Sequence, residues 1–173
     1  MDFVCPPEPP VPTADMVVVV WKAAFHLGVY DDGGLVKHED QAACWPVALG
    51  GAPAGDKKRQ GDERTPEGEF RVTHRNPKSA FHLSLGLNYP TARHADAGLA
   101  AGIIDQATRD RVAAADAART MPVRTSALGG DIYIHGGGTF PSSWTDGCIA
   151  LDNEVMDWLF VNAKPGTRVV ILP

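Results

Sequence analysis

The amino-acid sequence predicts a mostly β domain of the α+β class, with one or two helices packed on the sheet. β-branched runs and turn signals alternate over residues 17–49 and return at 167–173. Only two stretches, 98–119 and 153–163, have a helical pattern. The length of 173 residues and the 44% hydrophobic content suit one domain with a core of its own.

The first third of the chain has the pattern of successive strands. Val17–Val20 is a β-branched run, and Asp31–Gly34 is a strong turn signal between two further strands. Another strand is expected over Trp45–Leu49, where it ends at two glycines.

The middle of the chain alternates between loop and sheet. Residues 52–69 are polar and rich in glycine and proline, which indicates a long surface loop whose charged run at 56–59 is solvated. "FRVT" at 70–73 resumes the sheet, and the alanine-rich, proline-free stretch 98–119 predicts one helix.

The last third predicts strand, helix and strand. "DIYIH" at 131–135 alternates apolar and polar residues, as in a short strand. A short amphipathic helix is expected over 153–163, with Asp152 or Asn153 as its cap, and "TRVVILP" at 167–173 is a closing strand.

Residues 1–16 form a proline-rich lead-in to the domain at 17–173 and are expected to be extended and irregular. They lack the basic and apolar regions of a signal peptide, and no stretch approaches the ~20 apolar residues of a membrane span. Three explanations remain open: residence in the cytosol, export without a cleaved signal, or a signal already removed. The net charge of −5 argues against a nucleic-acid partner.

The three cysteines, Cys5, Cys44 and Cys148, include at least one free thiol unless a pair forms between chains. In an oxidising compartment Cys5 and Cys44 can pair and leave Cys148 as a thiol, while two unpaired thiols are an equal alternative. Without a C-x-x-C pair, a structural zinc site is not expected.

The stretch "DIYIHGGGTFPSSWTDGCIALDN" at 131–153 is the candidate active site. A cysteine nucleophile needs a base to take its proton and donors for the oxyanion. His135 ends a strand, Cys148 follows after a loop, and Gly147 lets the backbone approach closely, so the N–H groups at 147 and 148 are candidate oxyanion donors. Taken alone, a cysteine before Ile-Ala-Leu is more typical of a core residue.

These residues resemble the catalytic domain of the L,D-transpeptidase (YkuD-type) family. That family has a His-Gly pair, a loop and then Ser/Thr-His-Gly-Cys with an apolar residue next, which His135-Gly136 and Thr145–Ile149 resemble. Upstream, 45–51 and 65–70 are similar to its glycine-ended strand and its Thr-Pro-x-Gly-x-Phe segment. Residues 76–90 resemble the branch with murein peptide amidases and transpeptidase-like proteins. The resemblance implies an L,D-transpeptidase-like β-sandwich or barrel.

The resemblance implies that Cys148 is the nucleophile and His135 the base, that a backbone carbonyl orients the histidine, and that no metal or organic cofactor takes part. Two positions depart from the family pattern. Asp146 stands where the family usually has histidine, and Ala150 stands where it usually has arginine. Asp146 is the local candidate for a third catalytic group, although a turn-forming role is an equal alternative.

Further residues are candidates for binding the substrate, each with packing or turn formation as the alternative. The candidates are Gly136, Trp144, Thr145, His82, Ser84 and Tyr89. Arg93 and Arg124 are candidates for pairing with substrate carboxylates.

The implied substrate is the stem peptide of peptidoglycan, and the implied enzyme is an L,D-transpeptidase or L,D-carboxypeptidase that forms a Cys148 thioester. The alternatives are a murein amidase that cleaves a lipoprotein–peptidoglycan link and an inactive wall-binding module. A serine esterase is disfavoured because no G-x-S-x-G follows the "HGGG" at 135–138, and a metallopeptidase is disfavoured because H-E-x-x-H is missing.

A wall enzyme without a visible signal suggests a hypothesis about delivery. It is an antibacterial toxin that a contact-dependent system, such as type VI secretion, carries to the periplasm, and a cognate immunity protein is its expected partner. Expression directed to the periplasm should then harm the cell more than cytosolic expression, and equal tolerance of both would count against the idea.

Overall fold

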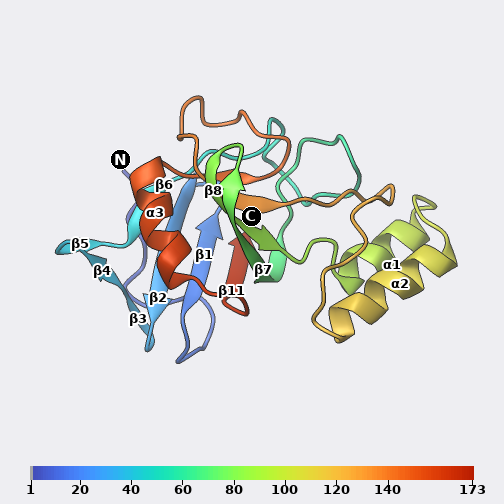
Figure 1. The fold of residues 1–173 in the computed structure, drawn as a ribbon, viewed down its shortest axis with the longest axis horizontal. Coiled ribbons are helices and arrows are strands. Elements are labelled where there is room, and N and C mark those ends of the chain that lie inside the picture. The colour runs from blue at the N-terminus through green and yellow to red at the C-terminus, as the bar shows by residue number, and fades with distance from the viewer. Residues whose placement is uncertain (1) are drawn as a thin grey trace.

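Strand β1 (Val17–Trp21) lies near the centre of a nine-stranded mixed sheet in the computed structural model, which describes residues 2–173 (Figure 1). The strand order is β10-β9-β8-β7-β11-β1-β2-β3, and β6 also pairs with β2. The other strands of this sheet are β2 (His26–Asp31), β3 (Gly34–Leu35), β6 (Cys44–Pro46), β7 (Gly68–Ser79), β8 (His82–Leu87), β9 (Tyr133–His135), β10 (Ile149–Ala150) and β11 (Arg168–Leu172). The mostly β class is confirmed.

Several predicted strands and turns are confirmed in detail. The turn signal at 31–34 joins β2 to β3, residues 70–73 lie within β7, and no helix or strand forms between 52 and 67. A separate two-stranded sheet, β4 (Lys37–His38) with β5 (Gln41–Ala42), follows β3.

The segment 44–50 closes the sheet on itself. β6 pairs with β2, and just beyond it Ala48 forms a bridge with Ala150 of β10, at the opposite end of the strand order. The predicted single strand over 45–49 is therefore divided between two partners. Pro46 lies at the division, where its missing N–H cannot continue the ladder with β2.

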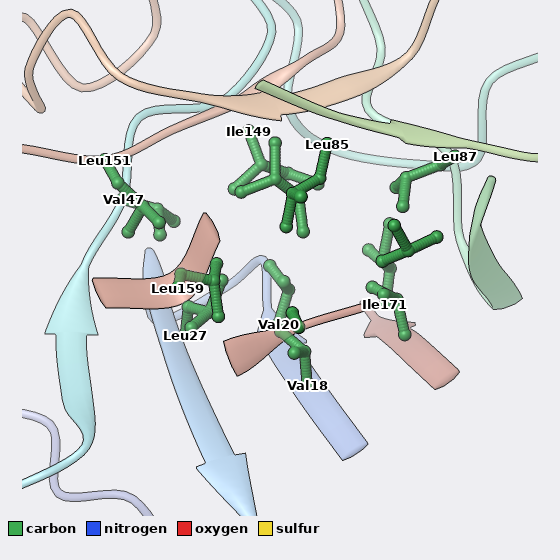
Figure 2. Close-up of a cluster of buried hydrophobic side chains, with 14 of the residues drawn as sticks. Val18, Val20, Leu27, Val47, Leu85, Leu87, Ile149, Leu151, Leu159 and Ile171 are labelled. Atoms are coloured by element: carbon green, nitrogen blue, oxygen red, sulfur yellow. The ribbon is translucent and has the colours of Figure 1, made fainter. Parts of the chain in front are cut away.

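The core fills the space between the curved sheet and helix α3 (Asn153–Asn162). Val18 and Val20 of β1 point into it together with Leu85 and Ile149, as Figure 2 shows. Leu159 brings the apolar face of α3 onto the same cluster. Because side chains alternate along a strand, Val18 and Val20 bury one face of the β1 run and leave the other valines facing outward.

Residues 2–16 cover that outward face, and Met1 lies outside the described residues. Val11 packs against a second cluster around Val17 and Val19. The hydroxyl of Tyr30 donates to the carbonyl of Pro6 (2.8 Å). Cys5 is buried and forms a disulfide with Cys44. The sequence left open whether these two cysteines are paired or free, and in the structure they are paired.

The structure has three helices within residues 2–173, and the single helix predicted over 98–119 is wrong. Helix α2 (Gln106–Ala117) lies inside that range, whereas α1 (Ala92–Ala100) begins before it and ends near its start, and the two form a hairpin beside the sheet (Figure 1). Gly102 turns the chain with a positive φ of 71°, and Asp105 starts α2 by accepting a hydrogen bond from the Thr108 N–H. Among the described residues, no helix is both long and apolar enough to cross a bilayer.

Candidate active site

Parallel pairing of β9 with β10 brings the two halves of the predicted motif together. Ile134 lies opposite Ile149, and His135 lies opposite Ala150. Cys148 is the residue just before β10, so its side chain comes beside the main chain of Tyr133.

Both predicted catalytic residues line one pocket of about 370 Å³. Its walls come from four parts of the chain: the loop after Gly50, the β7–β8 hairpin, the chain leading into β9, and the loop that ends at Cys148. The long loop of 51–67 and the loop of 136–147 lie along the same end of the sheet (Figure 1).

The main chain fixes the orientation of His135. Its Nδ1 lies 2.6 Å from the carbonyl oxygen of Gly136, and a carbonyl only accepts, so Nδ1 carries the proton. The ring stacks on Phe81, with ring centroids 4.6 Å apart, and meets the edge of Trp144. This leaves Nε2 as the basic nitrogen. Burial lowers the pKa of His135, and the bond to Gly136 partly opposes that effect.

Main-chain groups also hold the Cys148 thiol. Sγ accepts a hydrogen bond from the Tyr133 N–H and donates its own proton to the carbonyl of Asp131, each at 3.4 Å. Within residues 2–173, Cys148 Sγ and His135 make no direct hydrogen bond. Catalytic contacts of this kind often tighten only when substrate binds.

A cysteine nucleophile reacts as the thiolate, whereas the resting thiol of Cys148 is held in the protonated form. Burial raises the pKa of Cys148 to about 11. The Tyr133 N–H opposes that rise, the charges of Asp146 and Asp131 add to it, and the charge of Lys57 opposes it. With the pKa of His135 lowered, the pair rests as a neutral thiol and a neutral imidazole near pH 7.

A short loop anchored at several points holds Cys148 at the pocket. The Thr145 hydroxyl donates to the carbonyl of Cys148 (2.7 Å) and accepts from the N–H of Gly147 (3.2 Å). Gly147 has a φ of 137°, and a Cβ there would lie 2.7 Å from the carbonyl oxygen of Arg64. Of the two N–H groups proposed for the oxyanion, that of Gly147 is used inside the loop. The N–H of Cys148 has no partner within residues 2–173.

Trp144 and Gly136 lie in contact with His135. Trp144 lines the pocket and donates from Nε1 to the carbonyl of Gly138 (3.1 Å). Gly136 supplies the carbonyl that orients the histidine, and a Cβ there would lie 2.6 Å from Asn153 Oδ1, so a larger residue does not fit.

The structure does not bring His82 or Tyr89 to the pocket. His82 pairs with Asp157 of α3 (2.5 Å). Tyr89 is 1% exposed, and its hydroxyl donates to the carbonyl of Leu128. Ser84 is buried in β8 opposite His135 in the strand pairing.

The charged candidates have different surroundings. Asp146 is exposed at the pocket, and His135 Nδ1 is bonded to a carbonyl rather than to this carboxylate. Arg93 pairs with Asp56 (3.0 Å), away from the pocket lining, and Arg124 pairs with the pocket residue Asp131 (2.8 Å).

Sequence reasoning missed Phe81 and Lys57. Phe81 lies at the β7–β8 turn and has no local pattern that points to the site. Lys57 belongs to the charged run at 56–59 that was expected to be solvated. It is instead 2% exposed, because the loop folds around Asp62 and turns the lysine inward.

One family model matches most of the chain. The family model described as YkuD, the L,D-transpeptidase catalytic domain, matches residues 15–171. No curated protein matched the chain.

Solved structures share the fold at low sequence identity. The helical cell shape determining protein Pgp2 from Campylobacter jejuni has a TM-score of 0.57 and 23% identity, over 91% of this chain and 47% of its own. An L,D-transpeptidase (residues 123–326) from Xylanimonas cellulosilytica has a TM-score of 0.56 and 16% identity, over 96% of this chain and 64% of its own. L,D-transpeptidase 1 from Mycobacterium tuberculosis has a TM-score of 0.51 and 12% identity, over 92% and 62%.

The chain thus spans about half to two thirds of the length of these structures. The family match covers nearly all of it and includes the two β-strands, the loop and the cysteine that form the pocket. The chain belongs to the YkuD family of L,D-transpeptidase catalytic domains.

Proposed function

We propose that this protein is a cysteine acyltransferase or peptidase that acts on the stem peptides of peptidoglycan. The observation that carries the proposal is the shared pocket of Cys148 and His135, in which a main-chain carbonyl leaves Nε2 of the histidine free to take a proton. Membership of the family supports the substrate class.

In the first step, Cys148 Sγ attacks the carbonyl carbon of the bond between the third residue and the terminal D-alanine. The S–H proton leaves the Asp131 carbonyl for His135 Nε2 as the S–C bond forms, because the resting thiol is protonated. The N–H of Cys148 donates to the oxyanion. The C–N bond then breaks, His135 returns the proton to the leaving amine, and a thioester remains.

In the second step, an amine or water attacks the thioester. His135 takes a proton from the acceptor, the C–S bond breaks, and the proton returns to Cys148. An amine acceptor makes the protein a transferase that forms a crosslink or exchanges a D-amino acid. Water makes it an L,D-carboxypeptidase.

An extracytoplasmic place of action is part of the proposal. The Cys5–Cys44 disulfide supports it, because such bonds persist mainly in oxidising compartments. Delivery by a secretion system and a cognate immunity protein stay predictions.

The test is mass spectrometry of purified tetrapeptide muropeptides incubated with the protein, with and without an added D-amino acid. Loss of D-alanine alone identifies a carboxypeptidase, and exchange products or dimers identify a transpeptidase. We expect Cys148→Ala to abolish turnover, with a rate at least about 10³-fold lower, because no thioester can form.

A fold control and two adverse outcomes complete the experiment. Thermal unfolding of Cys148→Ala should match the wild type, so that lost activity reports chemistry. Activity that survives this substitution would overturn the mechanism. No turnover by the wild type would favour the alternatives, a murein amidase that acts on a lipoprotein link or an inactive wall-binding module.

A further inference from the structure

Two lysines are buried among the described residues, and their surroundings differ. Lys22 Nζ has three acceptors, the carbonyls of Gly55 (2.6 Å) and Thr65 (2.7 Å) and the carboxylate of Glu67 (3.0 Å). Lys57 Nζ has one acceptor within residues 2–173, Asp62 at 2.8 Å. An ammonium group has three N–H donors, so Lys22 is fully satisfied by the fold whereas Lys57 keeps donors to spare.

The fold does not need Lys57 to satisfy Asp62. One carboxylate oxygen of Asp62 accepts the N–H groups of Lys58 (2.7 Å) and Arg59 (3.1 Å), and the other accepts that of Arg64 (3.2 Å). These main-chain donors hold the loop without the lysine. Asp62 therefore keeps its hydrogen bonds without Lys57, and its contact with the ammonium group serves to position the lysine.

Lys57 is 2% exposed and contributes to the lining of two pockets, the active-site pocket and a second one beside α1. It lines the pocket together with Cys148, and its positive charge lowers the pKa of that thiol, against the larger effect of burial. In the part of the chain that the structure describes, it is the one lysine or arginine in the pocket lining. Burying an ammonium is unfavourable unless partners compensate, so a second anion is expected beside it.

The proposed acyl-transfer reaction brings such an anion. The leaving D-amino acid is the last residue of the peptide, so its carboxylate is one carbon away from the scissile nitrogen. When Cys148 attacks, this carboxylate must lie inside the same pocket. Asp131 and Asp146 also line that pocket and would repel it, although Arg124 pairs with Asp131.

We propose that Lys57 binds the terminal carboxylate of the leaving D-amino acid and so selects peptides with a free C-terminus. This inference rests on the proposed function and adds a recognition residue to it. The pairing is charge-assisted and shielded from water, which is the setting in which such a hydrogen bond contributes most.

The test compares two substrates that differ only at the C-terminus, the tetrapeptide acid and the same tetrapeptide with a C-terminal amide. We expect the wild type to have a kcat/KM about 10- to 100-fold higher for the acid. Lys57→Gln should lower kcat/KM for the acid by the same factor and leave that for the amide nearly unchanged. Lys58→Gln is the matched control: this lysine is the next residue in the loop, its side chain is exposed, and its main-chain bond to Asp62 is retained.

The outcomes separate this inference from the proposed function. A wild type that cleaves acid and amide equally, or a Lys57→Gln variant that keeps the preference, overturns the role of Lys57 while the enzyme remains a peptidase. An equal loss for both substrates means that the lysine only supports the loop. If Lys57→Gln does not fold, equal turnover of the acid and the amide by the wild type still overturns the inference. A wild type that turns over neither peptide instead contradicts the proposed function.

Discussion

Cys148 and His135 lie in surroundings that disfavour charge on either side chain. Burial raises the pKa of the thiol and lowers that of the imidazole, so near neutral pH both are uncharged. In the proposed mechanism, a neutral pair transfers its proton during attack instead of before it, which makes the orientation of His135 decisive. Gly136 and Phe81 supply that orientation, through a hydrogen bond at the edge of the ring and a stacking contact on its face.

The reactivity of the Cys148 thiol should reflect this pKa. With a pKa of about 11, only about 0.1% of the thiol is ionised at pH 8. We expect the rate of alkylation by iodoacetamide, measured on the Cys148 peptide, to keep rising up to about pH 11. Asp146→Asn should lower the pKa and raise the rate at pH 8, because the Asp146 charge disfavours the thiolate.

Asp40→Asn is the matched control for this experiment, since it removes an exposed carboxylate in the turn between β4 and β5. It should leave the alkylation rate unchanged. A rate that levels off below pH 8 would show a preformed thiolate–imidazolium pair and would contradict a resting state in which both groups are neutral.

The residues that the sequence identified are those whose partners are near in the chain. His135 and Cys148 lie within one motif, and the orienting carbonyl belongs to the next residue along. Phe81 and Lys57 also line the pocket, but they come from distant segments of the chain. Each precedes His135 by more than 50 residues and Cys148 by more than 60. Only the folded topology places them there, and a charged loop gives no sign of which lysine turns inward.

At the scale of elements, the loop that ends at Cys148 depends on its contact with the loop of 51–67. Gly147 is the contact point, because its Cα faces the carbonyl of Arg64. The N–H of Gly51 also donates to the carbonyl of Thr145 (3.0 Å). Two irregular segments thus support each other where no strand or helix does.

Gly147→Ala should destabilise the protein more than Gly138→Ala. Both glycines lie in the same loop with positive φ, at 137° and 102°. A Cβ at Gly138 has 3.9 Å to its nearest neighbour, whereas one at Gly147 has 2.7 Å. We expect a loss of about 1–2 kcal/mol in the free energy of unfolding from φ alone in both variants, and about 1–3 kcal/mol more for Gly147→Ala.

Urea unfolding measures these free energies, and muropeptide turnover measures the effect on the site. Gly147→Ala should also lower turnover, because the clash displaces Cys148, while Gly138→Ala should retain most of it. Equal losses of stability in the two variants would show that backbone strain, and not contact between the loops, limits this position.

Element prediction succeeded mainly where a pattern is local, and it failed at one feature with local signals and at one with distant partners. The valine run of β1 and the turn at 31–34 are visible in a few residues. The break between α1 and α2 has local signals too, at Gly102 and Asp105, but the alanine-rich composition led to the prediction of one helix. The bridge from Ala48 to Ala150 joins residues about 100 positions apart, and no spacing rule predicts it.

At the scale of the molecule, one segment links the N-terminal lead-in to the active site. Cys44 holds the disulfide to Cys5, and four residues later Ala48 pairs with β10, the strand directly after Cys148. The lead-in also covers the outer valines of β1. The disulfide therefore holds the lead-in against β1 and links it to the segment 44–50 that closes the sheet.

Loss of this disulfide should lower stability strongly. Cys5 and Cys44 are 39 positions apart, for which the chain-entropy model gives about 4 kcal/mol at 25 °C. For a domain of this size, that corresponds to a melting temperature roughly 8–15 °C lower.

The measurement is thermal unfolding of the wild type and of the Cys5→Ser/Cys44→Ser variant, each with and without a phosphine reductant. The reductant should lower the melting temperature of the wild type toward that of the variant and leave the variant unchanged, because Cys148 forms no disulfide within the chain. A wild type that melts at the same temperature with and without reductant would show that the lead-in is held by packing alone.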